Sequence, residues 1–204
     1  MFSFFEKNYY VPKFHHLLVA PFNLRSRLYY LINREKRNAK AGKKAEIFIK
    51  INNLVDIDMI EKLYAASKAG VKIRLIVRGI CALIPKLIGF SENIEAISIV
   101  DKYLEHPRIF MFHNDGKPEV FIGSADLMTR NLDHRIEIVM PIVDEKIKKQ
   151  LTQIMELQWK DNVKARVFNE AQSNFFRTKT ATEKTIRSQD AIYDLLEDVV
   201  KKKK

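Results

Sequence analysis

The feature that most restricts the fold of this sequence is a strand–helix–strand pattern that begins at residue 46. Residues 46–51 are mainly β-branched and aromatic, which predicts a strand. Asp58 and Glu61 stand three residues apart and predict the start of a helix, and Gly70 marks its end. Residues 71–77 then predict a second strand. A β-α-β unit of this kind requires two parallel strands joined by a right-handed crossover.

Further strands and helices are expected on both sides of this unit. Asn114-Asp115-Gly116 predicts a hairpin turn, and residues 169–187 are polar and expected to be irregular. The predicted fold class is α/β, with a mixed β-sheet flanked by helices. The further strands are expected at residues 14–20, 94–100, 108–112, 120–122, 135–142 and 163–168. Helices are expected at residues 23–41 and 144–160 and in a last amphipathic segment capped by Ser188. In the helix at residues 144–160, the side chains expected to be buried are Ile147, Leu151, Ile154 and Met155.

Composition and charge narrow the class of protein. The sequence is 47% hydrophobic and has only 6 Gly and 6 Pro in 204 residues, which fits one sizeable core and excludes a disordered, collagen-like or coiled-coil chain. Residues 1–44 hold 10 basic and 2 acidic side chains, whereas residues 45–165 hold 17 of each. A basic stretch of this kind is typical of proteins that bind nucleic acid, phospholipid surfaces or polyphosphate, although a solvated helix face has the same composition.

The sequence also indicates a compartment. Cys81 is the only cysteine, so no internal disulfide can form and a reducing environment is expected. No apolar run approaches the roughly 20 residues that span a bilayer. We therefore expect a cytoplasmic protein and leave association with a membrane surface open. The aromatic residues at the start, Phe2 to Tyr10, have nothing before them to pack against, and we expect the chain to be a fragment of a longer protein.

One group of residues carries candidate chemistry. His106-Pro107-Arg108 leads into a predicted strand, and Gly123-Ser124-Ala125-Asp126 and then Asn131 follow the hairpin. This outline resembles the half-site of the phospholipase D superfamily, in which an HxK motif opens a strand and a GSxN-like segment completes the pocket. An imidazole in this place can act on phosphorus as a nucleophile or general acid, while cations and donors neutralise the phosphoryl oxygens. The sequence departs from the pattern at Arg108, which replaces the lysine, and at Asp126, which replaces the asparagine, and it holds only one half-site.

Arg78 is a second candidate, because it stands at the carboxyl end of the strand at residues 71–77. Ligands of open α/β sheets bind at this end, and a guanidinium can contact a phosphate through two hydrogen bonds. Gly79 follows it and allows a close approach of the backbone to a ligand. An arginine that caps the strand through backbone carbonyls is the alternative.

Five segments resemble polyphosphate kinase, and the resemblance covers residues 1 to about 168. They are Asn52-Asn53-Leu54-Val55-Asp56, Leu63-Tyr64-Ala65-Ala66-Ser67, Leu75-Ile76-Val77-Arg78-Gly79-Ile80-Cys81, Ala96-Ile97-Ser98-Ile99-Val100-Asp101-Lys102-Tyr103-Leu104-Glu105-His106 and Ser124-Ala125-Asp126-Leu127-Met128-Thr129-Arg130-Asn131.

The resemblance implies a phospholipase D-like fold and the reversible transfer of the terminal phosphate of ATP to inorganic polyphosphate, with magnesium. It implies that residues 1–17 end a preceding domain, that residues 18–168 form the C-terminal catalytic domain, and that residues 169–204 form a tail with the terminal helix. The phosphorylated histidine of the family lies in the preceding domain. In this chain Arg78 and His106 match positions that bind ATP, and His106 matches the second active-site histidine. Arg108, Ser124, Arg130 and Asn131 are further candidates for the pocket, with a scaffolding role as the alternative.

Three functions follow as hypotheses. We favour an ATP:polyphosphate phosphotransferase that works together with the N-terminal domains of its parent protein. It is expected to form a homo-oligomer and not to bind nucleic acid. The isolated chain is then expected to be inactive. A phosphodiesterase of the phospholipase D class, with two half-sites in a dimer, is the second. The third hypothesis is a non-catalytic module that binds polyanions through residues 25–44. The sequence assigns no metal ligands to this chain.

Overall fold

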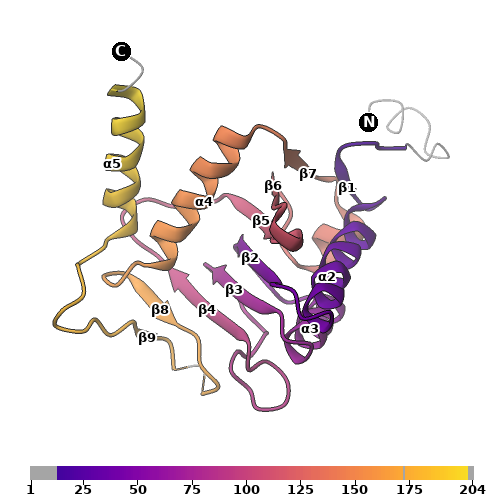
Figure 1. Ribbon diagram of the computed structural model, residues 1–204, viewed down its shortest axis with the longest axis horizontal. Helices are drawn as coiled ribbons and strands as arrows, with labels where there is room; N and C mark the ends of the chain where they lie inside the picture. Colours follow the sequence, from indigo (N-terminus) through magenta and orange to yellow (C-terminus); the bar gives the residue numbers. More distant parts are fainter. Residues whose placement is uncertain (1–12, 172, 202–204) are drawn as a thin grey trace.

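The computed structural model describes residues 13–171 and 173–201, and within them nine strands form one mixed β-sheet (Figure 1). The strands are β1 (Leu18–Ala20), β2 (Glu46–Ile51), β3 (Lys72–Val77), β4 (Ile94–Ile99), β5 (Arg108–Phe112), β6 (Glu119–Gly123), β7 (Glu137–Ile142), β8 (Ala165–Val167) and β9 (Phe175–Phe176). Their order is β1-β7-β6-β5-β2-β3-β4-β8-β9. The aromatic cluster at the start of the sequence lies outside the described residues.

Helices pack on both faces of the sheet. They are α2 (Leu24–Lys40), α3 (Ile57–Lys68), α4 (Glu145–Trp159) and α5 (Ser188–Lys201), with a short 3₁₀ turn η1 (Asn114–Gly116) and a π-helical turn η2 (Arg130–His134). Figure 1 shows α2 and α3 side by side against the sheet, while α5 projects from the opposite side of the molecule, next to α4. No helix in the described ranges is both long and apolar enough to cross a membrane.

The predicted β-α-β unit is confirmed. β2 and β3 are parallel, with Glu46 opposite Lys72 and Ile51 opposite Val77, and α3 connects them. β4 is parallel to β3, whereas β5 is antiparallel to β2 and forms the predicted hairpin with β6. Consequently β2, β3 and β4 end where β5 and β7 begin. We call this the C-terminal end of the sheet.

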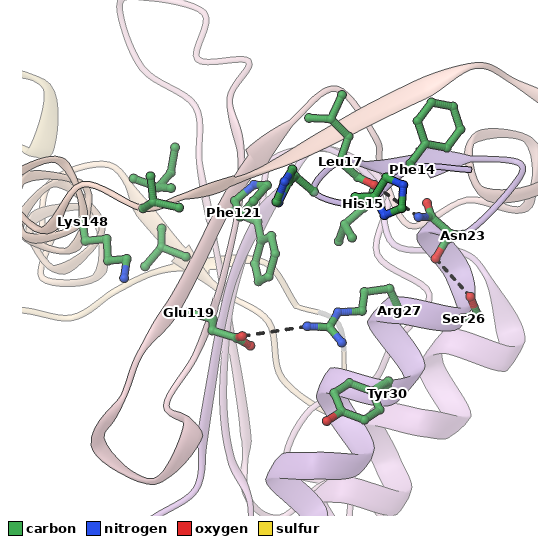
Figure 2. A pocket seen from close by; sticks show the side chains of 16 residues that line it. Phe14, His15, Leu17, Asn23, Ser26, Arg27, Tyr30, Glu119, Phe121 and Lys148 are labelled. Atoms are coloured by element: carbon green, nitrogen blue, oxygen red, sulfur yellow. Dashed lines mark hydrogen bonds and ion pairs between the residues drawn. The ribbon is translucent and has the colours of Figure 1, made fainter. Parts of the chain in front are cut away.

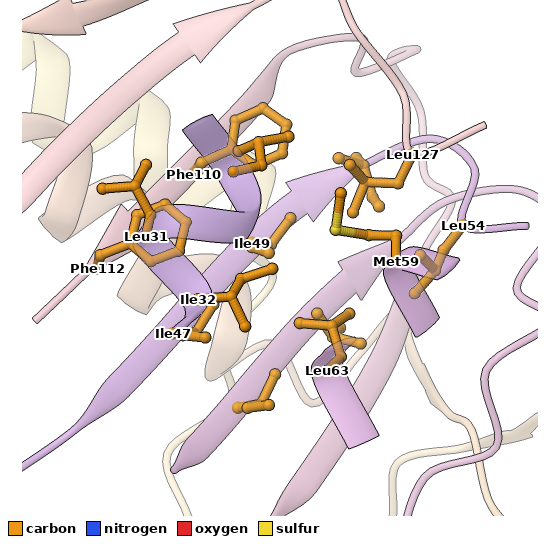
Figure 3. Close-up of a cluster of buried hydrophobic side chains, with 14 of the residues drawn as sticks. Leu31, Ile32, Ile47, Ile49, Leu54, Met59, Leu63, Phe110, Phe112 and Leu127 are labelled. Carbon is orange, nitrogen blue, oxygen red and sulfur yellow. The ribbon is translucent and has the colours of Figure 1, made fainter. Parts of the chain in front are cut away.

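The two faces of the sheet hold separate cores, because successive side chains of a strand point to opposite faces. Ile47 and Ile49 of β2 face α2 and α3 and belong to the larger core, several of whose members Figure 3 labels. Phe48, between them, faces α4, where its ring meets Trp159 edge-on at 5.7 Å between centroids. Both cores are required, since a central strand can only be buried if helices cover each face.

Several predicted element ends were wrong. Asp56 rather than Asp58 caps α3, because its carboxylate accepts a hydrogen bond from the backbone N–H of Met59 at 3.0 Å. The first strand begins at Leu18 and not at residue 14, since only Leu18–Ala20 pairs with β7.

The C-terminal third differs in three places. Ile147 of α4 is 48% exposed and not part of its buried side. Ser188 does not cap α5 through its side chain; its backbone N–H instead donates to Asp161 at 2.7 Å. The segment expected to be irregular contains β9, which pairs with β8. The last two features depend on a partner elsewhere in the chain, Asp161 for Ser188 and β8 for β9.

Candidate functional site

The C-terminal end of the sheet brings Arg78 and His106 into contact. Arg78 directly follows β3 and His106 precedes β5, and β2 lies between these strands. Nη2 of Arg78 lies 3.3 Å from Nδ1 of His106. A guanidinium can only donate, so Nδ1 is the acceptor, and the neutral imidazole then carries its proton on Nε2. The His106 ring is exposed and Arg78 is half-buried, so both are accessible to a ligand.

Arg78 keeps an unused donor. Its Nη1 is buried and has no hydrogen-bond partner among the described residues. The backbone carbonyl of Arg78 accepts a hydrogen bond from Ser98 Oγ at 3.3 Å. A buried, unpaired cationic donor is costly, and a bound anion would satisfy it.

Gly79 lies close to the loop that follows β2. A Cβ atom at this position would lie 2.8 Å from Asn53 Oδ1 and 3.0 Å from the carbonyl oxygen of Asn52. Gly79 therefore allows the loops that follow β2 and β3 to lie close together, and it also lines a cavity beside Arg78. The close approach of the two loops fixes the backbone immediately after Arg78.

The two departures from the phospholipase D pattern form an ion pair with each other. Nε and Nη2 of Arg108 donate to the two oxygens of Asp126 at 3.1 and 3.2 Å. Asp126 also accepts from the backbone of Asn52 at 2.8 Å and from the side chain of Asn53 at 3.1 Å. Burial alone would raise the pKa of Asp126, but these hydrogen bonds outweigh it and hold the pKa below its usual value. Arg108 also donates to the backbone carbonyl of His106 at 2.9 Å, so this pair supports the histidine loop.

Ser124 and Asn131 meet at Glu137, a residue that the sequence did not single out. Ser124 Oγ donates to one carboxylate oxygen, and Asn131 Nδ2 donates to the other at 2.5 Å. Ser124 is exposed, whereas Asn131 and Glu137 are buried. Arg130 is exposed at the start of η2. Ser124 and Asn131 thus hold the turn after β6 against the start of β7.

A second missed carboxylate, Glu105, lies directly before His106. It accepts hydrogen bonds from Lys50 of β2, from Gln158 of α4 and, at 3.1 Å, from Gln189 of α5. We call these four residues the Glu105 cluster. Lys50 is 4% exposed, and burial lowers the pKa of its ammonium group while Glu105 opposes the shift.

Gln189, in the first turn of α5, and Arg187, just before this helix, hold the same loop at two further points. Gln189 accepts from the N–H of Tyr103 at 3.0 Å and donates to its carbonyl at 2.8 Å. Arg187 donates to both oxygens of Asp101 at 2.6 and 2.8 Å. The loop that carries His106 is therefore fixed by side chains from β2, α4 and α5.

The residues of this site do not fit a resident magnesium ion. The described part of the chain contains no group of three or more His, Cys, Asp or Glu side chains that could hold a metal. The carboxylates of Glu105, Asp126 and Glu137 are occupied by protein donors.

Figure 2 shows a cavity of about 710 Å³ that is separate from this site. It lies at the opposite end of the sheet, where β6 begins and β7 ends, and Arg27, Glu119 and Lys148 are among its lining residues. Neither Arg78 nor His106 lines it. Although this cavity is large, it is therefore not part of the site formed by Arg78 and His106.

The fold and the Arg78–His106 contact together define a phospholipase D-like α/β domain with a cationic site at the C-terminal end of its sheet. The Nuc protein of Salmonella typhimurium, a phospholipase D family member, shares this fold with a TM-score of 0.58 at 15% identity, over 75% of this chain and 96% of its own.

A more specific match comes from the family model "Polyphosphate kinase C-terminal domain 2", which matches residues 17–189. The chain belongs to the polyphosphate kinase family. It is 54% identical to polyphosphate kinase of Vibrio vulnificus (strain YJ016) over 98% of its length and 29% of that protein's. The crystal structure of polyphosphate kinase from Porphyromonas gingivalis superimposes with a TM-score of 0.91 at 43% identity, covering 97% of this chain and 30% of that one. The chain thus spans less than a third of the length of these relatives.

Proposed function

We propose that this chain supplies part of the active site of an ATP:polyphosphate phosphotransferase, which reversibly transfers the terminal phosphate of ATP to inorganic polyphosphate. The observation that carries the proposal is the 3.3 Å contact between Arg78 and His106 at the C-terminal end of the sheet. Two groups suited to phosphoryl oxygens meet there, in a chain that belongs to the polyphosphate kinase family.

Each residue has a distinct role in this proposal. Arg78 holds phosphoryl oxygens, and its buried Nη1 is free for this among the described residues. His106 accepts from Arg78 at Nδ1, which leaves the Nε2–H to donate to oxygen as negative charge develops during transfer. Phosphoryl transfer depends mainly on such positioning and charge stabilisation.

Other parts of the enzyme lie outside this chain. The phosphorylated histidine belongs to the N-terminal domains, which are therefore required partners, and the isolated chain is expected to be inactive. The domain limits at residues 17 and 168, the homo-oligomer and the cytoplasmic location remain predictions. In this proposal magnesium is bound by the phosphates of ATP, since this ion commonly binds substrate phosphates and has few protein ligands.

The two alternatives have less support. A phospholipase D-type phosphodiesterase needs the cation after its histidine, but Arg108 is paired with Asp126. A polyanion-binding module needs free cations in residues 25–44. There, Arg25 contacts Asp56 at 2.8 Å and Arg34 contacts Glu119 at 2.6 Å. Arg27 and Lys43 also contact carboxylates, so half of the basic side chains of this stretch have an acidic partner.

The test is polyphosphate formation from ATP by the full-length protein that contains this chain. We expect His106→Ala to lower the rate by about 10²–10⁴-fold, the usual contribution of a general acid or base. The matched control is His16→Ala, an exposed histidine in the separate cavity, which should retain the parent rate. A parent rate in the His106 variant would show that this histidine is scaffolding. An inactive parent that hydrolyses phosphodiesters would favour the second function.

A further inference from the structure

A cavity of about 330 Å³ lies beside Arg78, at the C-terminal ends of β3 and β4. A second arginine, Arg166 of β8, lines it as well. Ser98, Cys81, Phe168 and Asn174 are also among its lining residues. This volume is at the lower end of the roughly 300–1,000 Å³ found for small-molecule sites.

Arg166 is held in place before any ligand arrives. It pairs with Ser98 in the register of β8 and β4, so the two side chains share one face of the sheet. Its Nη1 donates to the carbonyl oxygen of Asn174 at 3.0 Å, and its guanidinium lies 4.0 Å from the centre of the Phe176 ring. An arginine fixed in this way loses little conformational entropy when it binds an anion.

The charge of the cavity is positive. No carboxylate lines it, and its charged lining residues are Arg78 and Arg166. Burial raises the pKa of the Cys81 thiol to about 11, so this group is neutral at pH 7. The ligand chemistry that fits is therefore anionic.

The strand order indicates an extended ligand. His106 and Arg78 are in contact, and Arg166 lies beyond them on β8, separated from β3 by β4. Neighbouring strands lie about 4.8 Å apart, so the backbones of Arg78 and Arg166 are roughly 10 Å apart. A row of three such groups along the end of the sheet suits a linear chain of phosphoryl groups better than a single phosphate.

We propose that the cavity between Arg78 and Arg166 binds the phosphoryl groups that adjoin the reacting one, with Arg166 as the outer contact. This inference rests on the proposed function and adds a binding residue to it. The ligand is a phosphate chain, which either the triphosphate of ATP or polyphosphate can supply.

The experiment measures kcat and the KM values for ATP and for polyphosphate separately, in the full-length protein and in Arg166→Gln. A charge-assisted hydrogen bond to phosphate predicts an increase in one KM of about tenfold or more, with kcat nearly unchanged. The substrate whose KM rises is the one that occupies the cavity. Arg166→Lys, which keeps the charge, should recover part of the loss. Lys149→Gln removes an exposed cation of α4 that does not line the cavity, and it should leave both KM values unchanged.

Binding of inorganic tripolyphosphate to the same proteins, measured by calorimetry, separates this inference from the proposed function. If the parent forms no polyphosphate but binds tripolyphosphate more tightly than Arg166→Gln does, the function is wrong and the cavity assignment holds. If the parent is active and Arg166→Gln matches it in both KM values and in tripolyphosphate affinity, the inference is overturned. Loss of kcat alone in both Arg166 variants would also overturn it, because that indicates a structural role.

Discussion

At the scale of single residues, the carboxylates near His106 serve as acceptors that fix loops. Asp126 binds Arg108 and the loop after β2, Glu137 binds Ser124 and Asn131, and Glu105 binds three donors. The hydrogen bonds from protein donors occupy all three carboxylates. The reactive surface of this end of the sheet is therefore cationic.

Asp126 gives a prediction about stability and pH. Its pKa is lower in the folded protein than in the unfolded chain, so its contribution is present above about pH 4 and is lost as the pH falls through the folded-state pKa. We expect Asp126→Asn to lower the free energy of unfolding by about 1–3 kcal/mol at pH 7. The difference from the parent should shrink towards pH 2, and urea unfolding at several pH values measures it.

Asp58→Asn is the control for this prediction, because its side chain is 75% exposed. A change within about 0.5 kcal/mol is expected there. A constant difference between parent and Asp126→Asn across the whole pH range would contradict the assigned role of the ion pair.

The sequence indicated part of this site. Arg78 and His106 could be singled out because each stands at a strand end in a segment that resembles a known family, and the structure brings them into contact. Glu137 and Lys50 could not, since nothing local marks a buried charge whose partner lies far along the chain. The pairing of Arg108 with Asp126 also required the register of β5 and β6, which only the folded sheet defines.

At the scale of elements, the first turn of α5 holds the loop that carries His106, whereas the rest of the helix does not contribute to this contact. Arg187 and Gln189 bind the loop at residues 100–107, while the rest of the helix extends away from the sheet (Figure 1). Gln189 contacts both the backbone of Tyr103 and the side chain of Glu105. It is thus a positioning residue for His106.

We expect Gln189→Ala to lower kcat of the full-length enzyme by about tenfold, because a small displacement of a reacting group costs one or two orders of magnitude in rate. The KM for ATP should change less, since the backbone of Arg78 is held by Ile51 and Ser98 and not by α5. Gln153→Ala, on the exposed side of α4, is the control and should behave as the parent. Equal kcat values in all three proteins would show that the loop keeps its geometry without α5.

Elements with a strong internal pattern were predictable, and those defined by pairing were not. The bounds predicted for β2 and β5 are confirmed, because a run of β-branched, aromatic or other apolar residues marks each strand. β9 has only two residues, Phe175 and Phe176, and both are exposed. Such a strand exists only because β8 offers it hydrogen bonds, and no sequence periodicity could reveal it.

At the scale of the whole molecule, the sheet has buried central strands and short edge strands. β2, β3 and β5 are covered on both faces, while β1 and β9 are short strands at the two sides of the sheet. Amide groups exchange with solvent at rates set by the free energy of local opening. The centre and the sides should therefore differ widely in protection.

Hydrogen exchange followed by mass spectrometry measures this difference. We expect peptides from β2, β3 and β5 to exchange last, through global unfolding, and peptides from β9 and the end of α5 to exchange first. Rapid exchange in β2 or β3 would contradict the assignment of these strands to the centre of the sheet.

The Glu105 cluster has a consequence for the synthesis of the protein. The three donors that meet at Glu105 lie 55, 53 and 84 residues from it along the chain, and Gln189 is the last of them to be made. β2, β3 and β5 have all been made before Gln189, since synthesis runs from the N-terminus. The loop that carries His106 therefore gains its contact with Gln189 only after α5 has begun to be made, later than all the strands of the sheet.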